Sequence, residues 1–313
     1  MVKWKKNETV DFLSKNLLLI LGALALAFLV FIITMSFIIP FILQGQELKP
    51  AGIAIIPLKG EISNQSGDYF SSYVTASEVA EMIEEADSDP SIGAIFLDID
   101  SPGGEVVASK QIVYKIRETK KPIYSYIGSI GASGAYYAAS ASDYIFADSD
   151  SLTGSIGVIS TVTNVQELMQ NFGIKVTNIT TGDYKSLGSP FDEFTEEERL
   201  ILQEIIDGTF QQFRSDILEF RNGKISEAEL DSVDDGRILS GRQALAKNLV
   251  DELLPKEKAL KKVAELEKIK NPQFIEYNKT EPSFFDLLFY SGKYFGNGLL
   301  SSAVSQTNQI KIR

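Results

Sequence analysis

The sequence predicts an α/β protein, because short apolar runs alternate with amphipathic helical patterns along most of its length. Two further observations support this fold class. Two of the helical patterns begin with a capping box, a threonine followed three residues later by a glutamate. Glycine-bearing segments also follow or flank several predicted strands, as expected where the loops at strand ends form a binding crevice.

Five short runs are predicted to be strands, since they are rich in Ile, Val and aromatic residues and are too short for helices. They are residues 52–58, 92–99, 122–127, 143–148 and 175–180. They alternate with helical patterns, and this alternation indicates repeated strand-helix units in one domain.

Three helices are predicted from caps and apolar spacing. The two capping boxes are Thr75 with Glu78 and Thr195 with Glu198. The first begins a helix between the first two strands, and apolar residues spaced over 106–116 predict a second after strand 92–99. The second box begins a longer helix that should run to about Arg221, where Asn222 and Gly223 end it.

A long apolar stretch near the N-terminus predicts a membrane anchor. From Leu17 to Ile39 the chain carries no charge over roughly 23 residues, the length needed to cross a bilayer as a helix. The alternative is a cleaved signal peptide, but such apolar cores are usually about 7–15 residues long. We therefore divide the chain into a segment 1–16, an anchor 17–43, an α/β domain 44–270 and an apolar, aromatic tail 271–313 to which no role is assigned.

Charges beside the anchor predict its orientation. Four lysines precede it, namely Lys3, Lys5, Lys6 and Lys15. The flank that follows carries one nearby lysine, Lys49, which lies beside Glu47. The positive-inside rule then puts the N-terminus in the cytoplasm and everything after Gln44 on the outer side of the cell membrane.

Composition excludes several classes of function. The chain of 313 residues has no histidine and no cysteine, which excludes a Ser-His-Asp triad, a Cys-His dyad and a His-ligated zinc site. Its formal charge of −12 argues against nucleic acid as a partner. A hydrolase of this composition would need a hydroxyl activated by an amine, a pair of carboxylates, or a metal held by oxygen ligands alone.

Three glycine-bearing segments are candidate site loops, at residues 101–104, 128–140 and 152–158. Gly103 and Gly104 near a helix start, and Gly134 after Ser133, could present backbone N–H groups to a developing oxyanion. Ser133 lies among small residues that let a peptide carbonyl approach, so it is the candidate nucleophile. The alternative is that Ser133 is simply an N-cap serine.

A serine without histidine needs another base, and a lysine serves if burial lowers its pKa toward neutrality. Lys185 lies in a Gly/Ser-rich loop just after a predicted strand, so it is the candidate base. The alternative is a surface ion pair with Asp183. Four other lysines have the pattern of helix-surface or helix-end charges: Lys110, Lys115, Lys120 and Lys121.

These residues occur in motifs that together resemble the signal peptide peptidase A family, in its short single-domain form. The resemblance runs from about Ile53 to Leu254 and rests on IAIIPLKGEI, DIDSPGGEVVAS, KPIYSYIGSIGASGAYYAASASDYIFAD, LTGSIGVI, GDYKSLGSPFDEFTEEE and DGRILSGRQALAKNLVDEL, in that order. The sequence departs from the family where Glu105 replaces a third glycine common after the glycine pair, and this leaves the substrate preference open.

The resemblance implies a ClpP/crotonase-like fold and a serine endopeptidase without metal or organic cofactor. It implies Ser133 as nucleophile and Lys185 as general base, with Ser155 orienting the lysine amine and the backbone of Gly104 and Gly134 forming the oxyanion hole. It also implies homo-oligomers above the membrane, and it leaves open whether the serine and lysine of one site come from the same chain or from adjacent protomers. Remnant signal peptides and other extended hydrophobic peptides are the implied substrates.

Three alternatives remain open at this stage. The same dyad would serve a membrane protease dedicated to a stomatin-like partner. A crotonase-like acyl-CoA enzyme would also use two backbone amides as an oxyanion hole, but it would leave Ser133 and Lys185 unexplained. A non-catalytic membrane scaffold would only bind peptides.

Overall fold

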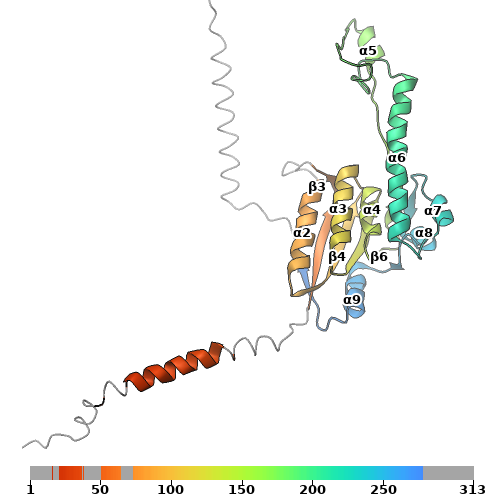
Figure 1. The fold of residues 1–313 in the computed structure, drawn as a ribbon. Coiled ribbons are helices and arrows are strands. Elements are labelled where there is room, and N and C mark those ends of the chain that lie inside the picture. The colour runs from red at the N-terminus through yellow and green to blue at the C-terminus, as the bar shows by residue number, and fades with distance from the viewer. Residues whose placement is uncertain (1–15, 17–20, 37, 39–50, 65–72, 278–313) are drawn as a thin grey trace, which may run out of the picture. The chain divides into compact units, whose positions relative to one another are not determined.

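The apolar runs of the sequence form a largely parallel sheet in the computed structural model (Figure 1), which describes residues 16, 21–36, 38, 51–64 and 73–277. The central strands are β1 (Gly52–Lys59), β4 (Ile92–Ser101), β5 (Ile123–Ala132) and β6 (Tyr144–Ala147). They pair in that order, with β10 (Gln273–Glu276) beside β1 and β9 (Glu252–Leu253) beside β6. Four of the five predicted strands are thereby confirmed.

Four shorter strands extend this main sheet or form a second, two-stranded sheet. They are β2 (Glu61–Ser63), β3 (Tyr73–Thr75), β7 (Leu152–Gly154) and β8 (Ile238–Ser240). β7 pairs with the end of β5 in parallel and with β8 in antiparallel orientation. β2 pairs with β3 as a separate parallel pair, beside the end of β4.

Helices cover both faces of the main sheet. They are α2 (Ala76–Ser88), α3 (Val106–Glu118), α4 (Gly134–Ser140), α5 (Gln166–Asn171), α6 (Glu196–Phe220), α7 (Glu227–Asp231), α8 (Gly241–Ala246) and α9 (Lys256–Leu266). α2, α3 and α4 stand side by side on one face, and α9 lies on the other (Figure 1). Both predicted capping boxes are present, at the starts of α2 and α6, and the predicted helix after β4 is α3.

The strands alternate between two cores, as a sheet buried on both faces requires. Ala54 and Ile56 of β1 pack with α2, α3 and α4, whereas Ile53 and Ile55 face the core that contains α9. This double burial explains why the strand sequences are continuously apolar and not strictly alternating.

A buried ion pair fixes the C-terminal end of α6. The Arg221 side chain is 1% exposed, and its Nη1 donates to Oδ2 of Asp251 at 2.7 Å. Burial alone would raise the pKa of the Asp251 carboxyl, but hydrogen bonds and charge from Arg221, with support from Lys224, hold that pKa below its usual value. α6 is thereby anchored at the end where it meets the domain core.

The fifth predicted strand is wrong. Residues 175–180 form neither strand nor helix, and their side chains are exposed. Ile179, for example, is 96% exposed. An isolated run of β-forming residues gains no ladder hydrogen bonds, and this segment has no neighbouring strand with which to pair.

The chain divides into two units, Met1–Lys49 and Pro50–Arg313. In the first, residues 21–36 form a helix whose apolar side chains are exposed. Among the described helices none is both long and apolar enough to cross a membrane. The predicted anchor 17–43 lies partly outside the described residues, and so does most of the tail 271–313.

Candidate active site

Ser133 stands at the junction of β5 and α4 in an unusual backbone conformation. Its φ of 53° with ψ of −122° is rarely adopted by non-glycine residues and indicates strain. The conformation is held by a hydrogen bond from its N–H to the Gly154 carbonyl at 2.8 Å and one from Tyr137 N–H to its own carbonyl at 2.9 Å. Its side chain makes no cap hydrogen bond to α4, so the simple N-cap role is not what the hydroxyl performs.

Glycines let two backbone segments approach Ser133 closely. A methyl group added at Gly103 would come within 2.9 Å of Ser133 Cβ and 2.7 Å of Gly134 N. One added at Gly134 would lie 3.5 Å from Gly104 N. The glycine loop after β4 and the start of α4 are therefore packed backbone to backbone, which side chains at these positions would prevent.

Two amides beside Ser133 are free to bind an anion. Within the described part of the chain, neither the Gly104 N–H nor the Gly134 N–H has a hydrogen-bond acceptor. Gly134 is the first residue of α4, where N–H groups have no partner inside the helix. Two adjacent free amides next to a strained serine are the arrangement needed to stabilise a tetrahedral oxyanion.

Ser155 lies beside Ser133. β5 pairs with β7 so that Ala132 is opposite Gly154, and Ser133 and Ser155 follow directly after the ends of these two strands. Ser155 also has a positive φ, of 50°, and its N–H donates to the Arg237 carbonyl at 2.8 Å. The structure therefore brings together four of the five predicted site residues: Ser133, Gly134, Gly104 and Ser155.

Lys185 is not with them. It lies in an exposed turn between α5 and α6, and neither its ammonium nor the Asp183 carboxylate has a hydrogen-bond or ion-pair partner among the described residues. α6 runs from this segment back to the core, where the Phe213 ring meets Tyr137 of α4 with ring centroids 4.6 Å apart. That contact is roughly 25 Å along α6 from its start at Glu196. Figure 1 shows α5 beyond the end of α6 that is distant from α4.

Two residues near the site were missed by sequence reasoning. Ser109 is buried, its hydroxyl donates to the Glu105 carbonyl at 2.9 Å, and it fills the space beside Gly134. Tyr137, one turn after Ser133, hydrogen-bonds through its hydroxyl to Asp216 of α6. Ser109 could have been found as a polar residue on the otherwise apolar face of α3. Tyr137 could not, because its partner Asp216 is 79 residues away in sequence.

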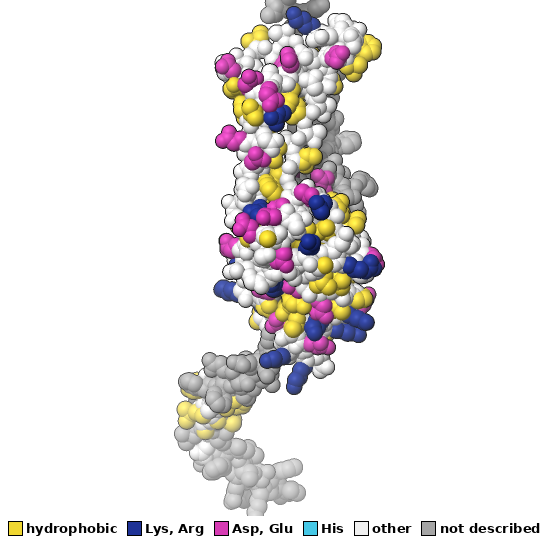
Figure 2. Space-filling view, turned by 90° about the vertical axis from the view of Figure 1, so that its right-hand side faces the viewer, with side chains coloured by type: hydrophobic (Ala, Val, Ile, Leu, Met, Phe, Trp, Pro, Cys, Tyr) yellow, Lys and Arg dark blue, Asp and Glu magenta, His cyan; other side chains and the backbone are white. Residues whose placement is uncertain are grey.

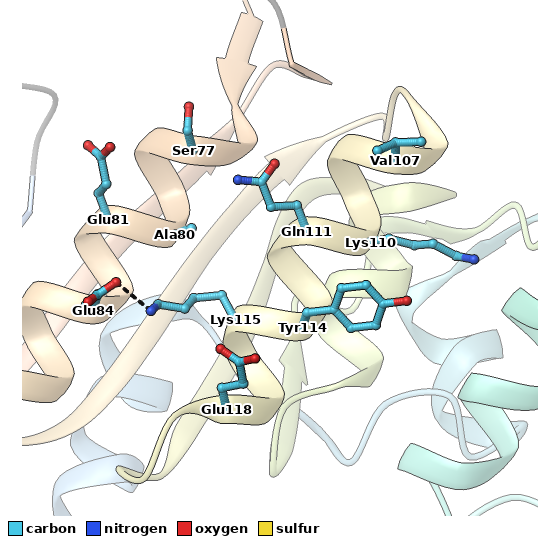
Figure 3. Close-up of a pocket in the computed structure, with 10 residues that line it drawn as sticks. All are labelled: Ser77, Ala80, Glu81, Glu84, Val107, Lys110, Gln111, Tyr114, Lys115 and Glu118. Atoms are coloured by element: carbon cyan, nitrogen blue, oxygen red, sulfur yellow. Dashed lines mark hydrogen bonds and ion pairs between the residues drawn. The ribbon is translucent and has the colours of Figure 1, made fainter.

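A separate groove lies between α2 and α3 on the outer surface (Figure 3). It is lined by Ser77, Ala80, Glu81, Glu84, Val107, Lys110, Gln111, Tyr114, Lys115 and Glu118. Lys115 and Glu84 form an ion pair in it, with Nζ and Oε2 2.6 Å apart. None of the predicted site residues lines this groove, so the reaction is not assigned to it. The described residues also contain no cluster of acidic residues that could hold a metal ion.

Comparison with known proteins identifies the family. Residues 115–270 match the model of peptidase family S49. A candidate protease of Methanocaldococcus jannaschii is 38% identical, over 70% of this chain and 70% of that protein. A candidate signal peptide peptidase of Enterococcus faecium is 31% identical over 64% of this chain and 59% of that protein. A chloroplastic serine protease of Arabidopsis thaliana is 29% identical over 75% of this chain and 36% of that protein.

The architecture and the relatives agree. The parallel sheet with helices on both faces is the arrangement expected of this family, and the relatives are named as proteases. The acyl-CoA alternative has no support among them. The chain belongs to peptidase family S49 and is a serine protease with a ClpP-like fold.

Proposed function

We propose that this protein is a membrane-anchored endopeptidase that cuts extended hydrophobic peptides, including remnant signal peptides, with Ser133 as nucleophile and Lys185 as general base. The observation that carries the proposal is the strained serine beside the two free amides of Gly104 and Gly134. A chain without histidine or cysteine leaves an amine as the natural base for that serine.

The reaction follows from these groups. The neutral Lys185 amine accepts the hydroxyl proton as Ser133 Oγ bonds to the scissile carbonyl carbon, and the Gly104 and Gly134 amides bind the resulting oxyanion. The lysine then gives its proton to the leaving amine, which leaves an acyl-enzyme ester. Lys185 next takes a proton from a water that attacks this ester, and it returns that proton to Ser133 Oγ as the ester bond breaks, which releases the carboxyl product and restores the serine. Ser155, beside Ser133, would orient the lysine amine.

Lys185 is proposed to act on the serine of a neighbouring copy. In its own chain it is exposed and distant along α6 from the contact with α4. Burial against a second copy would favour the uncharged amine that a base requires. The segment around it also carries exposed hydrophobic side chains suited to an interface, namely Ile159, Leu168, Phe172, Ile174, Ile179 and Tyr184.

Figure 2 is consistent with such an interface. Hydrophobic side chains appear near the upper end of the space-filling view, the end at which Figure 1 places α5. Phe172 is 75% exposed and Ile159 is 86% exposed. Aromatic and β-branched residues at this exposure are costly for an isolated surface, and a second copy of the segment would cover them.

The membrane anchor rests on the N-terminal sequence. Residues 21–36 form a helix of apolar, exposed side chains, and the lysines before it favour a cytoplasmic N-terminus with the protease domain outside. The substrate class is supported by the resemblance to signal peptide peptidases and by the name of the Enterococcus faecium relative.

The dyad is tested with the full chain in detergent and a fluorogenic hydrophobic peptide. Ser133→Ala and Lys185→Ala are each expected to lower kcat/KM by at least ~10³-fold, because removal of a nucleophile or its base abolishes the covalent route. Lys175→Ala, on the same exposed segment, is the matched control and should remain active. Undiminished turnover in either dyad variant would remove the proposed mechanism.

Substrate and site are tested separately. A fluorophosphonate should label Ser133 alone, as located by mass spectrometry of the digested protein. Peptides derived from signal sequences should be cut faster than polar peptides of equal length. If a folded membrane partner were cut and no free peptide were, a partner-dedicated protease would replace this substrate assignment. Labelling of a serine other than Ser133 would contradict the site.

A further inference from the structure

Glu105, which follows the glycine pair, does not use its side chain as its position would suggest. It is the N-cap residue of α3, yet its carboxylate makes no cap hydrogen bond to that helix. Instead Oε1 accepts from the Ser63 hydroxyl at 3.0 Å and Oε2 accepts from the Asn64 N–H at 3.0 Å. Both carboxylate oxygens therefore bind one short segment at the end of β2.

That segment is also what holds the glycine loop. Ile62 N–H donates to the Gly103 carbonyl and Glu105 N–H donates to the Ile62 carbonyl, both at 2.8 Å. In such a parallel bridge the residue between the two bonds, here Gly104, directs its own N–H away from the partner strand. β2 thus fixes the glycine loop while leaving the Gly104 amide free on the side of Gly134.

Besides these bonds, the buried Ile62 side chain holds β2 in the core, where it is 0% exposed. It is three residues long and pairs with β3, which is equally short. Strands of this length are held weakly by their own ladder. Hydrogen bonds to an ionised carboxylate are stronger than those between neutral groups, so the two 3.0 Å bonds from the exposed Glu105 side chain add to the contacts that fix β2.

The contact between β2 and the glycine loop leaves little room for adjustment. A methyl group at Gly104 would lie 2.0 Å from the Ile62 carbonyl oxygen, so β2 and the loop are already in backbone contact. Any displacement of β2 would therefore move Gly104 with it. A shift of a few tenths of an ångström would misdirect one of the two oxyanion donors.

We propose that Glu105 is a positioning residue, whose carboxylate clamps β2 against the glycine loop and thereby sets the direction of the Gly104 amide. The inference rests on the proposed function, in which that amide binds the oxyanion. The inference goes beyond the proposed function because it gives a role to Glu105, which stands where the resemblance leads one to expect a third glycine. A carboxylate near an oxyanion opposes its charge, so the clamp has to outweigh that repulsion.

The test uses the full chain in detergent and compares three variants. Glu105→Ala removes both acceptor oxygens, Glu105→Gln keeps one of them without the charge, and Glu118→Ala removes an exposed carboxylate from the same helix as the control. The measurements are kcat and KM for a hydrophobic peptide, the inhibition constant of a peptide aldehyde, which forms a tetrahedral adduct, and the thermal unfolding midpoint.

Glu105→Ala is expected to lower kcat by about 10-fold and to weaken aldehyde binding by a similar factor, with KM changed less than about twofold, since the lost interaction operates in the transition state. Glu105→Gln should fall between the alanine variant and wild type. Glu118→Ala should match wild type. A loss of folding alone would lower the unfolding midpoint and the active fraction without changing the aldehyde affinity of the remaining sites.

Other outcomes overturn the inference. An unchanged kcat in Glu105→Ala would overturn it, and so would a change in that variant confined to KM. A higher kcat in Glu105→Gln would also overturn it, because charge repulsion would then be the dominant effect of the carboxylate. Ser63→Ala gives a second check, because its loss should be smaller and should not add to that of Glu105→Ala. If Ser133→Ala keeps activity, the proposed function fails; if Ser133 reacts while the Glu105 variants match wild type, this inference alone fails.

Discussion

The sheet around β4 and β5 and the segment carrying Lys185 differ in how their conformations are fixed. Eight of the ten residues of β4 are buried, and the strand has neighbours on both sides. Residues 156–195 contain one short helix, α5, and none of the residues of that helix is buried. Most of the other side chains in this segment are exposed. The segment around Ser133 is thus preorganised within one chain, whereas the segment of Lys185 has few buried contacts of its own, and under the proposed function a second copy would cover it.

The largest expected effect comes from an experiment that mixes two inactive variants. If serine and lysine come from different copies, Ser133→Ala and Lys185→Ala subunits should together form some intact sites. For random mixing in equal amounts we expect about a quarter of wild-type activity, against almost none for either variant alone. The measurement is peptide turnover after co-refolding or co-expression. Absence of any recovery, with mixed oligomers present, would show that the dyad forms within one chain.

The buried ion pair tests how rigidly α6 is anchored to the core. Asp251→Asn should lower the free energy of unfolding by about 3 kcal/mol, because it leaves the Arg221 charge buried without a full partner. Urea unfolding of the full chain measures this change. Glu252→Gln, at the next residue, is the control, because it removes a charge but keeps an oxygen that can accept the hydrogen bond from the Tyr144 hydroxyl.

The effect of this pair should depend on pH. The pKa of the Asp251 carboxyl is lower in the folded than in the unfolded protein, so its contribution is complete above the unfolded value of about 3.9 and is lost as pH falls through the folded value. Wild type and Asp251→Asn should therefore converge in stability at acid pH. A difference that grew on acidification would contradict this account.

Charges placed on the exposed segment should break assembly without unfolding the domain. Phe172→Asp with Ile179→Asp is expected to lower specific activity by at least about 10-fold, since apolar contacts between copies are replaced by buried charge. The unfolding midpoint should change little, because both side chains are exposed. Sedimentation and turnover measure the two effects, with Glu167→Asp as a charge-conserving control. Full activity of the double variant would exclude this surface from the interface.

The smallest expected effect concerns the link between α4 and α6. Tyr137→Phe removes the hydroxyl that binds Asp216 but keeps the ring contact with Phe213. Because Gln212 still donates to Asp216 at 2.7 Å, the loss of stability should be only about 1 kcal/mol. Thermal unfolding measures it. A Tyr137→Leu variant, which also removes the ring, should lose clearly more, and equal losses would assign the link to the hydroxyl alone.

Local patterns predicted much of the fold correctly. The short apolar runs of β1 and β4 indicated strands, and the capping boxes of α2 and α6 located both helix starts. The two-residue strand β9 and the exposed strand β10 were beyond such reasoning, because their pairing depends on neighbours distant in sequence. The run 175–180 has strand-forming residues, yet it has no partner and forms no strand.

For the site, the amino-acid sequence by itself determined the chemistry available. The absence of histidine and cysteine excluded the Ser-His-Asp and Cys-His mechanisms, and the small residues around Ser133 and the glycine pair made a serine with an amine base the candidate mechanism before any fold was known. Which groups meet was decided by tertiary structure alone. The pairing of β5 with β7, the bridge of Ile62 to Gly104 and the clamp from Glu105 join segments that are 22 to 42 residues apart, and such contacts exist only once the chain has packed.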